Sequence, residues 1–514
     1  MRSLGVILAL AGPGDGPVRF TDVTEAAGLV EPLAGLLGHG AAWGDFDGDG
    51  RPDLFVGGFC DRPAALYHPA PGPVPSRLLR RRGDGGFERA GQPAAECHAR
   101  TSGAVFADLD NDGDLDLYVA NNARARASRQ EEPQRTAQLR RSVLLRNDGG
   151  TFADVSSASG ACPEDLRRAR NVGVFDYDGD GLLDLLVLED FFAHGDKPPR
   201  SVLLRNRGGL RFEEANRAAG LPDDLYGLGH AAADLNGDHR ADFFVAHSNR
   251  LFLSGPGGTY REASDQREVF AWKPAHGEDW PCGAAFGDLD GDGDFDLVVS
   301  HHSVPGRLRL FLNDGAARFR EATREAGLDA LLPTKVPHVE IRDFDNDGRP
   351  DLYVSAAWVE EGRIVPLVYR NRGGLRFEAP RPLRGSMICY PAGPSADYDG
   401  DGRLDLFLVN WSPGRRCALL RNATPGGHWL GVRVTGRTFN RMGLGAKVRL
   451  MESGRLLGVQ EIAIGCGYAS GHQDGAHFGL GERTSVDLQV TLPNGKDVFR
   501  AGVQADQMLV VEEP

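Results

Sequence analysis

The chain has 514 residues, of which 41% are hydrophobic and 25% are charged, a composition typical of a globular protein. Its 72 acidic residues exceed its 58 basic residues, and the formal net charge of -14 excludes a broad nucleic-acid surface, which requires clustered surplus Lys and Arg. No run of 18 or more apolar residues occurs, which excludes a membrane-spanning helix.

The N-terminus resembles a very short export signal. Arg2 precedes an apolar run at residues 4–11, which ends in Ala9-Leu10-Ala11. We predict that residues 1–11 are a short signal peptide, which would place the protein in the extracellular space or the periplasm. If this segment is not a signal, the protein remains in the cytoplasm.

An acidic segment, DFDGDGRPDL at residues 45–54, occurs seven times at intervals of 54 to 68 residues. The copies follow D-x-[DN]-x-D-G-x-x-D-[LF], except that the fourth has Asn236 at position 3 and His239 in place of the glycine. Repetition at such a period is typical of a repeat architecture.

We predict metal ligands at positions 1, 3, 5 and 9 of each copy. They are Asp45, Asp47, Asp49 and Asp53; Asp108, Asp110, Asp112 and Asp116; Asp176, Asp178, Asp180 and Asp184; Asp234, Asn236, Asp238 and Asp242; Asp288, Asp290, Asp292 and Asp296; Asp343, Asp345, Asp347 and Asp351; and Asp397, Asp399, Asp401 and Asp405.

Oxygen ligands of this number and charge suit Ca²⁺ better than Mg²⁺ or a transition metal, and the sequence therefore predicts up to seven Ca²⁺ ions. A helix-loop-helix calcium site would require Glu at position 12. That position is aliphatic in all seven copies, for example Val56 and Leu408. The loops are therefore predicted to join two β-strands.

A small apolar strand precedes each loop, an apolar strand follows it, and a hairpin such as residues 143–152, with Asn-x-Gly-Gly at its turn, completes the unit. Four-stranded units at this period predict the blades of a seven-bladed β-propeller at residues 18–425. Small residues in the first strand suit a crowded centre. The last unit lacks its outer strand, and residues 19–29, which match residues 318–328, are predicted to supply it and close the ring.

If the loops lie at one face, the opposite face gathers the start of the first strand and the end of the second from every unit. Polar and aromatic residues collect there, including His39, Arg170, Trp280 and Trp411, and we expect their side chains to contribute little to blade packing. Histidine can act as acid, base or metal ligand near neutral pH. The catalytic candidates on this face are His230, His247, His301, His302, His338, Glu189, Asp190 and Tyr390.

The acidic repeat ends near residue 425, and residues 426–514 are predicted to form a small β-sandwich-like domain. Residues 440–446 (NRMGLGA), 465–470 (GCGYAS) and 477–481 (HFGLG) resemble signature segments of the ASPIC/UnbV domain. Behind FG-GAP-type, or VCBS-type, calcium repeats, this domain is characteristic of the cartilage acidic protein family. The sequence departs from the family pattern at Leu492, where Trp is usual, and at Met442, where an acid is common. The loops also resemble those of integrin α-subunit propellers, which implies extracellular calcium binding and adhesion.

Two functions remain open from the sequence. The first is a calcium-binding, secreted recognition or adhesion-type protein whose propeller face opposite the loops binds a protein, a glycan or a small molecule. The second is an enzyme, in natural-product biosynthesis for instance, with His and Asp or Glu on the same face. No nucleophile elbow, phosphate loop or metalloprotease motif occurs, so no reaction follows from a motif. The sequence leaves the oligomeric state undetermined.

Overall fold

The computed structural model describes residues 18–62, 66–67, 72–123, 140–190, 199–379 and 385–514. The predicted signal peptide at residues 1–11 lies outside these ranges. Strands dominate the described chain, whose helical segments are α2 (Ser156–Ser159), η2 (Ser264–Gln266) and α3 (Arg267–Phe270). None of the helices described is long and apolar enough to cross a bilayer. The prediction of an all-β fold is confirmed.

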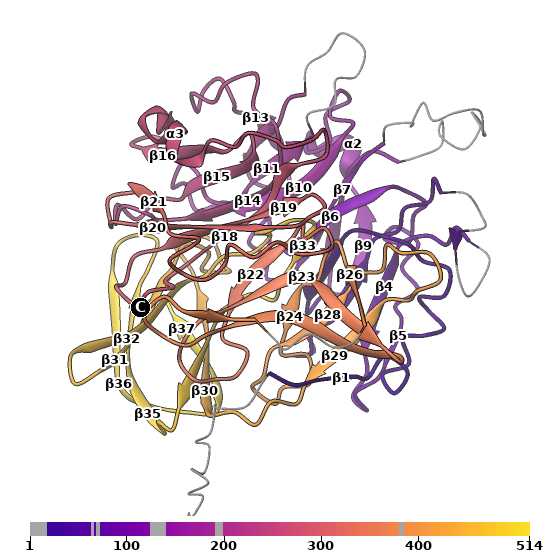
Figure 1. Cartoon of the computed structure of the whole chain (residues 1–514). Helices are drawn as coiled ribbons and strands as arrows, with labels where there is room; N and C mark the ends of the chain where they lie inside the picture. Colours follow the sequence, from indigo (N-terminus) through magenta and orange to yellow (C-terminus); the bar gives the residue numbers. More distant parts are fainter. Residues whose placement is uncertain (1–17, 63–65, 68–71, 124–139, 191–198, 380–384) are drawn as a thin grey trace, which may run out of the picture.

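Within the described ranges, seven sheets each carry one acidic loop, which joins the first strand to the second (Figure 1). We number the sheets and loops in chain order. From first strand to last, the sheets consist of β2 (Ala41–Gly44), β3 (Asp53–Val56), β4 (Arg77–Arg81) and β5 (Phe87–Arg89); β6 (Thr101–Ala107), β7 (Asp116–Asn121), β8 (Val143–Asp148) and β9 (Thr151–Asp154); β10 (Ala169–Phe175), β11 (Asp184–Glu189), β12 (Val202–Asn206) and β13 (Phe212–Glu214); β14 (Gly227–Ala233), β15 (Asp242–His247), β16 (Arg250–Gly255) and β17 (Thr259–Glu262); β18 (Trp280–Gly287), β19 (Asp296–His302), β20 (Leu308–Asn313) and β21 (Phe319–Glu321); β22 (Val339–Arg342), β23 (Asp351–Glu360), β24 (Arg363–Asn371) and β25 (Phe377–Glu378), with β26 (Ser386–Cys389) beside β23; and β27 (Ser395–Ala396), β28 (Asp405–Leu408), β29 (Ala418–Asn422) and β1 (Phe20–Asp22).

The strand that leaves each acidic loop is apolar on both faces. β7 reads DLYVAN, β11 reads DLLVLE, and every residue of both strands is buried. A strand with one face in water would alternate apolar and polar residues, whereas a strand covered on both faces is a continuous apolar run. Each sheet is therefore enclosed by its two neighbours.

Successive sheets pack through separate hydrophobic clusters, such as the one that contains Phe55 of the first sheet and Phe106 of the second. The seventh sheet packs in the same way on the first. The rings of Trp43 and Phe407 have centroids 6.3 Å apart, and Trp43 Nε1 donates to the carbonyl of Pro394 at 3.0 Å. The first and the seventh sheet are thus in direct contact.

The N-terminal strand completes the seventh sheet. β1 pairs antiparallel with β29, with Phe20 opposite Asn422, and Arg19 N donates to Thr424 Oγ1 at 2.9 Å. The chain start thus supplies the outer strand of the seventh sheet.

The C-terminal domain (residues 426–514) contributes two further sheets. One contains β34 (Ala476–Gly481), β30 (His428–Thr435) and β37 (Gln507–Glu512), and the other contains β32 (Arg455–Glu461), β31 (Lys447–Glu452), β35 (Ser485–Thr491) and β36 (Asp497–Gln504). Val432 and Leu488, one from each sheet, share a hydrophobic cluster with Val174 and Leu185 of the third sheet. The core of this domain is therefore continuous with that of the repeated sheets.

Part of the C-terminal domain enters the space between the first strands of the seven sheets. We call residues 462–473 the insertion loop; its short strand β33 (Ser470–Gly471) lies near the middle of the molecule in Figure 1. β33 pairs in parallel with β2 and packs on β6, and Ile464 bridges to Val174 of β10. The remaining four sheets contact the loop through hydrogen bonds: Gly467 N to His230 O (2.9 Å) and Ala284 O (2.9 Å), Tyr468 N to His338 Nδ1 (3.0 Å), and Gln473 N to Ser395 O (3.4 Å).

Glycine is required where the insertion loop touches the sheets. Gly467 has φ +86°, and a Cβ atom there would lie 2.5 Å from the His338 ring. A Cβ atom on Gly229 would lie 2.1 Å from the Gly467 carbonyl oxygen. The small residues of the first strands therefore make room for this loop.

Candidate metal centres and the opposite face

The acidic loops share one backbone curl. In the first loop, Asp45 accepts the backbone N–H groups of Asp49 at 3.0 Å and Gly50 at 2.8 Å. The first Asp of loops two, three, six and seven accepts the same pair of bonds. Gly50 has φ +84°, a conformation that glycine adopts without strain. This curl turns the side chains of the loop inward.

Carboxylates converge inside these loops. In loops one, two, three, five and six, ligand oxygens of three Asp side chains lie within 4.8 Å of one another, as in Asp45, Asp47 and Asp53. Because Ca²⁺ binds oxygen at about 2.3–2.6 Å, one ion between the three side chains could contact all of them. The residues fit a hard, oxygen-seeking divalent cation.

The loop carboxylates are held in an environment that disfavours their charge. Burial raises the pKa of Asp53, Asp116 and Asp296 at position 9 to about 8, and neighbouring carboxylates add to the effect. Burial also raises the pKa of Asp108 and Asp176 at position 1 to about 6. A bound divalent cation would favour the charged form of these groups.

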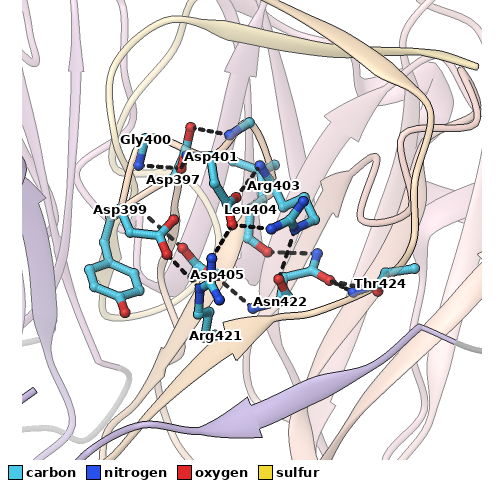
Figure 2. A network of polar contacts seen from close by, with 12 residues as sticks. Asp397, Asp399, Gly400, Asp401, Arg403, Leu404, Asp405, Arg421, Asn422 and Thr424 are labelled. Carbon is cyan, nitrogen blue, oxygen red and sulfur yellow. Dashed lines mark hydrogen bonds and ion pairs between the residues drawn. The ribbon is translucent and has the colours of Figure 1, made fainter. Parts of the chain in front are cut away.

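Arginines partly neutralise the loops from outside, as Figure 2 shows for the seventh. Arg421 Nε lies 2.5 Å from Asp399 Oδ2, a second nitrogen lies 2.7 Å from Asp401 Oδ2, and Arg403 also pairs with Asp401. The Arg421 side chain is 40% exposed, so water screens its charge. Such partly exposed guanidinium groups do not replace a cation inside the loop.

An asparagine in the third strand connects successive loops. Asn206 Nδ2 in the third sheet donates to Leu109 O of the second loop at 2.6 Å and to Leu183 O of its own loop at 2.9 Å. Equivalent bonds to the preceding loop are Asn147 to Phe46 (2.7 Å), Asn313 to Leu235 (3.1 Å), Asn371 to Leu289 (3.1 Å) and Asn422 to Phe344 (2.7 Å). The sequence predicted only turns at these positions, although a Gly recurs two residues after four of the asparagines, namely Asn147, Asn206, Asn313 and Asn371.

The C-terminal domain lies on the loop face of the sheets. Asp108 N donates to Met442 Sδ at 3.2 Å, His477 Nε2 lies 3.0 Å from Gly402 O, and Gly481 N donates to Asn346 O at 2.9 Å. A cavity of about 350 Å³ remains between this domain and loops five and six, with Asp288 and Asp343 in its wall.

The catalytic candidates do not form one cluster. His230 and His338 are fully buried in the centre, where they contact the insertion loop. Glu189 is buried and accepts two backbone N–H groups at 2.8 Å. Asp190 is buried beside Arg170, at 2.9 Å. Tyr390 packs in the core between the sixth and seventh sheets.

The His301 side chain is more buried than we expected for a residue on the opposite face. Its side chain is fully buried, its ring lies 4.6 Å from that of Trp272, and its Nδ1 lies 3.5 Å from Asp279 Oδ1. Burial lowers the pKa of His301 to about 3. Because the end of β19 is covered by the segment before β18, His301 belongs to the core.

Five residues expected on the opposite face are partly exposed and form two groups of contacting rings, which we call together the histidine-tryptophan cluster: His247, Trp280 and His302 in one group and His39 and Trp411 in the other. Trp280 stacks between His247 and His302, with centroids 5.8 and 5.2 Å away. The His39 ring lies 4.1 Å from that of Trp411.

Positive charges surround this cluster. Burial and the charges of Arg170, Arg100 and Arg62 lower the pKa of His39, and Arg62 lies 4.1 Å above the ring of Trp411. The insertion loop also reaches this face, because its Tyr468 hydroxyl lies 3.2 Å from His39 Nδ1. Two distant parts of the chain therefore build the cluster's surroundings.

Comparisons with known proteins agree with the sequence patterns. Residues 436–514 match the family model described as ASPIC and UnbV, and residues 70–119 and 288–354 match that of the FG-GAP-like repeat. The chain is 26% identical over 503 residues to cartilage acidic protein 1 of mouse and of human, covering 93% of this chain and 73% and 72% of those proteins. The resemblance to the cartilage acidic protein family is confirmed.

Similarity to solved structures is lower. Rhamnogalacturonan lyase YesW is 13% identical, with 76% of this chain and 72% of that chain covered and a TM-score of 0.41. The BP39L lectin from Burkholderia pseudomallei is 11% identical, with 76% and 97% covered and a TM-score of 0.42. Scores of this size carry no functional argument.

Proposed function

Because the chain combines FG-GAP-like repeats with an ASPIC and UnbV segment and is similar to cartilage acidic protein 1, we propose that it is a calcium-binding recognition protein that acts outside the cytoplasm. In this proposal the seven sheets are the blades of a closed propeller, which the pairing of β1 with β29 and the packing of Trp43 on Phe407 support. The calcium ions stabilise the loop face, and the opposite face binds the partner.

The convergence of carboxylates carries the calcium part of the proposal. Three Asp side chains in one loop bring oxygens within 4.8 Å of one another, and burial raises the pKa of the ninth residue to about 8 in three loops. Without a cation, this arrangement would be unfavourable at neutral pH, because each carboxylate loses hydration and repels its neighbours. Binding of Ca²⁺ relieves both costs.

The opposite face is the better recognition surface, because the C-terminal domain covers much of the loop face. Trp411, with Arg62 above it, combines flat apolar area with adjacent charge, and Trp280 stacks on His302. Aromatic and Arg side chains are enriched in protein interfaces and also bind sugar rings and small planar ligands. These features favour a protein, glycan or small-molecule partner at the histidine-tryptophan cluster.

Recognition is favoured over acid/base catalysis by the state of the histidines. Burial lowers the pKa of His247 to about 4 and that of His302 to about 3. A general acid or base works best when its pKa lies near the working pH, so these neutral imidazoles are poor proton carriers at pH 7. They remain able to stack and to form hydrogen bonds.

Two measurements test this proposal. Elemental analysis after gel filtration in metal-free buffer should find bound calcium, and fewer than about four ions per chain would contradict the assignment.

Arrays of glycans and extracellular proteins should then show partners that the wild type binds and Trp411→Ala does not. The matched control is Phe499→Ala, an exposed aromatic of β36 that is 58% exposed. If Trp411→Ala keeps every partner, the recognition surface lies elsewhere.

A further inference from the structure

The fourth acidic loop differs from the other six in its own residues. Asn236 supplies an amide at position 3, and His239 at position 6 has φ +61°, a conformation that strains a residue with a Cβ atom. The curl is nevertheless retained, because Asp234 accepts the backbone N–H groups of Gly237, Asp238 and His239 at 2.7, 3.0 and 3.2 Å. The loop therefore keeps its shape with one carboxylate fewer.

A lysine of the C-terminal domain enters this loop. Lys447, the first residue of β31, places Nζ 3.1 Å from Asp234 Oδ2 and 3.2 Å from the Asp234 carbonyl oxygen. Its side chain is only 12% exposed, and Nζ lies 5.2 Å from the centroid of the Phe295 ring. Glu461, which is opposite Lys447 in the sheet, accepts Asp234 N at 2.9 Å. The ammonium group is thus fixed against Asp234, and Glu461 holds the backbone of the same Asp.

The first Asp of the other six loops has different partners. Within the described chain, the first Asp of each of those six loops accepts backbone N–H groups and forms no ion pair, so the pair between Asp234 and Lys447 is particular to the fourth loop. In the third strand Leu253 stands where Arg205 or Arg421 approaches position 3 of another loop, and Leu312 stands there in the fifth sheet. The fourth loop thus combines the loss of the Asp carboxylate at position 3 with the presence of an inner ammonium.

We propose that the Lys447 ammonium is the permanent cation of the fourth loop. This loop then takes no calcium, and the ion pair between Lys447 and Asp234 anchors the C-terminal domain whether or not calcium is present. The chain then binds at most six Ca²⁺ ions; this count rests on the proposed calcium binding of the other loops. An ion bound to Asp234 Oδ2 would lie at most about 5.5 Å from Nζ, given a calcium-oxygen distance of about 2.4 Å. Repulsion between the two cations in this largely buried site disfavours double occupancy.

Calcium counting on two matched variants tests the vacancy of the fourth loop. Asp288→Asn removes the first carboxylate of the fifth loop, and Asp234→Asn removes that of the fourth. We expect Asp288→Asn to lose one bound calcium per chain relative to the wild type, and Asp234→Asn to lose none. Loss of one calcium in Asp234→Asn would overturn the proposal.

Melting of Lys447→Met tests the anchor independently of calcium. We expect Lys447→Met to lower the Tm by about 5 °C both in excess calcium and in EDTA, whereas the control Lys496→Met, at an exposed turn, leaves the Tm unchanged. An unchanged Tm of Lys447→Met in EDTA would overturn the anchor. If the wild type binds no calcium at all, the proposed function fails, and this melting comparison still decides the role of Lys447.

Discussion

The two ends of the repeated sheets differ in how their structure is specified. At the loop end, each unit repeats its residues, its backbone curl and its hydrogen bonds. Asp53 in the first loop and Asp116 in the second, for example, accept backbone N–H groups from equivalent positions of their units. At the opposite end, residues from unrelated positions meet, such as His39 and Tyr468. Repetition fixes the first region locally, whereas the second depends on contacts between distant parts of the chain.

Removing calcium should break the loop end first and give the largest effect. We expect EDTA to lower the Tm by about 10 °C or more, because several sites each contribute binding free energy to the folded state. Excess calcium should restore the Tm, and magnesium should restore less of it. Equal melting with and without calcium would contradict metal binding by the loops.

The sign of the pH dependence follows from the raised pKa values. Asp53 and Asp116 have a pKa of about 8 in the folded protein, above the unfolded value of 3.8. Between these values the folded metal-free protein binds more protons than the unfolded chain, and its stability therefore falls as pH rises. In EDTA the Tm should be higher at pH 5.5 than at pH 8, and saturating calcium should remove this trend.

Breaking one link between loops should have a smaller effect. Asn206→Ala leaves the carbonyls of Leu109 and Leu183 without their donor, and we expect the free energy of unfolding to fall by about 3 kcal/mol. Arg207→Ala, on the exposed turn next to it, should change it by less than about 0.5 kcal/mol. Urea denaturation at fixed calcium concentration measures both. Similar values for the two variants would show that the link contributes little.

The smallest predicted change sharpens the description of the opposite end. His301→Ala should lower the free energy of unfolding by about 2 kcal/mol because the ring is fully buried, whereas His302→Ala should cost less than about 1 kcal/mol because its ring is partly exposed. The same denaturation assay compares them. If His302→Ala proves the more destabilising, the burial of the two rings does not determine their contributions.

The loop end could be predicted because its information is local. Seven copies of one segment specify the curl, the carboxylates and the strand that follows, and the match between residues 19–29 and 318–328 predicted the pairing of β1 with β29. The role of Asn206 was missed because its acceptor, Leu109, lies in the preceding unit. The predicted hairpin turn was sufficient to explain Asn206, and it required no hydrogen bond to a neighbouring unit.

The centre and the opposite end could not be predicted from the pattern. Nothing in residues 462–473 marks them as an insertion between the first strands, and His230 and His338 therefore read as accessible groups although the insertion loop covers them. His301 was misplaced for the same reason, since Trp272 and Asp279 reach it from outside the repeat. Burial by segments that do not repeat leaves no periodic signal.

The position of the insertion loop has a consequence for synthesis of the protein. Residues 462–473 leave the ribosome only after all seven acidic loops have emerged, so the first strands of the nascent sheets lack the contacts of the insertion loop until then. The backbone groups of His230 and Ala284 that bond to Gly467 lack this partner until the last tenth of the chain arrives. Translation at about 5–20 residues per second makes this a delay of many seconds. During that time the first strands expose to solvent the backbone groups that the insertion loop later binds.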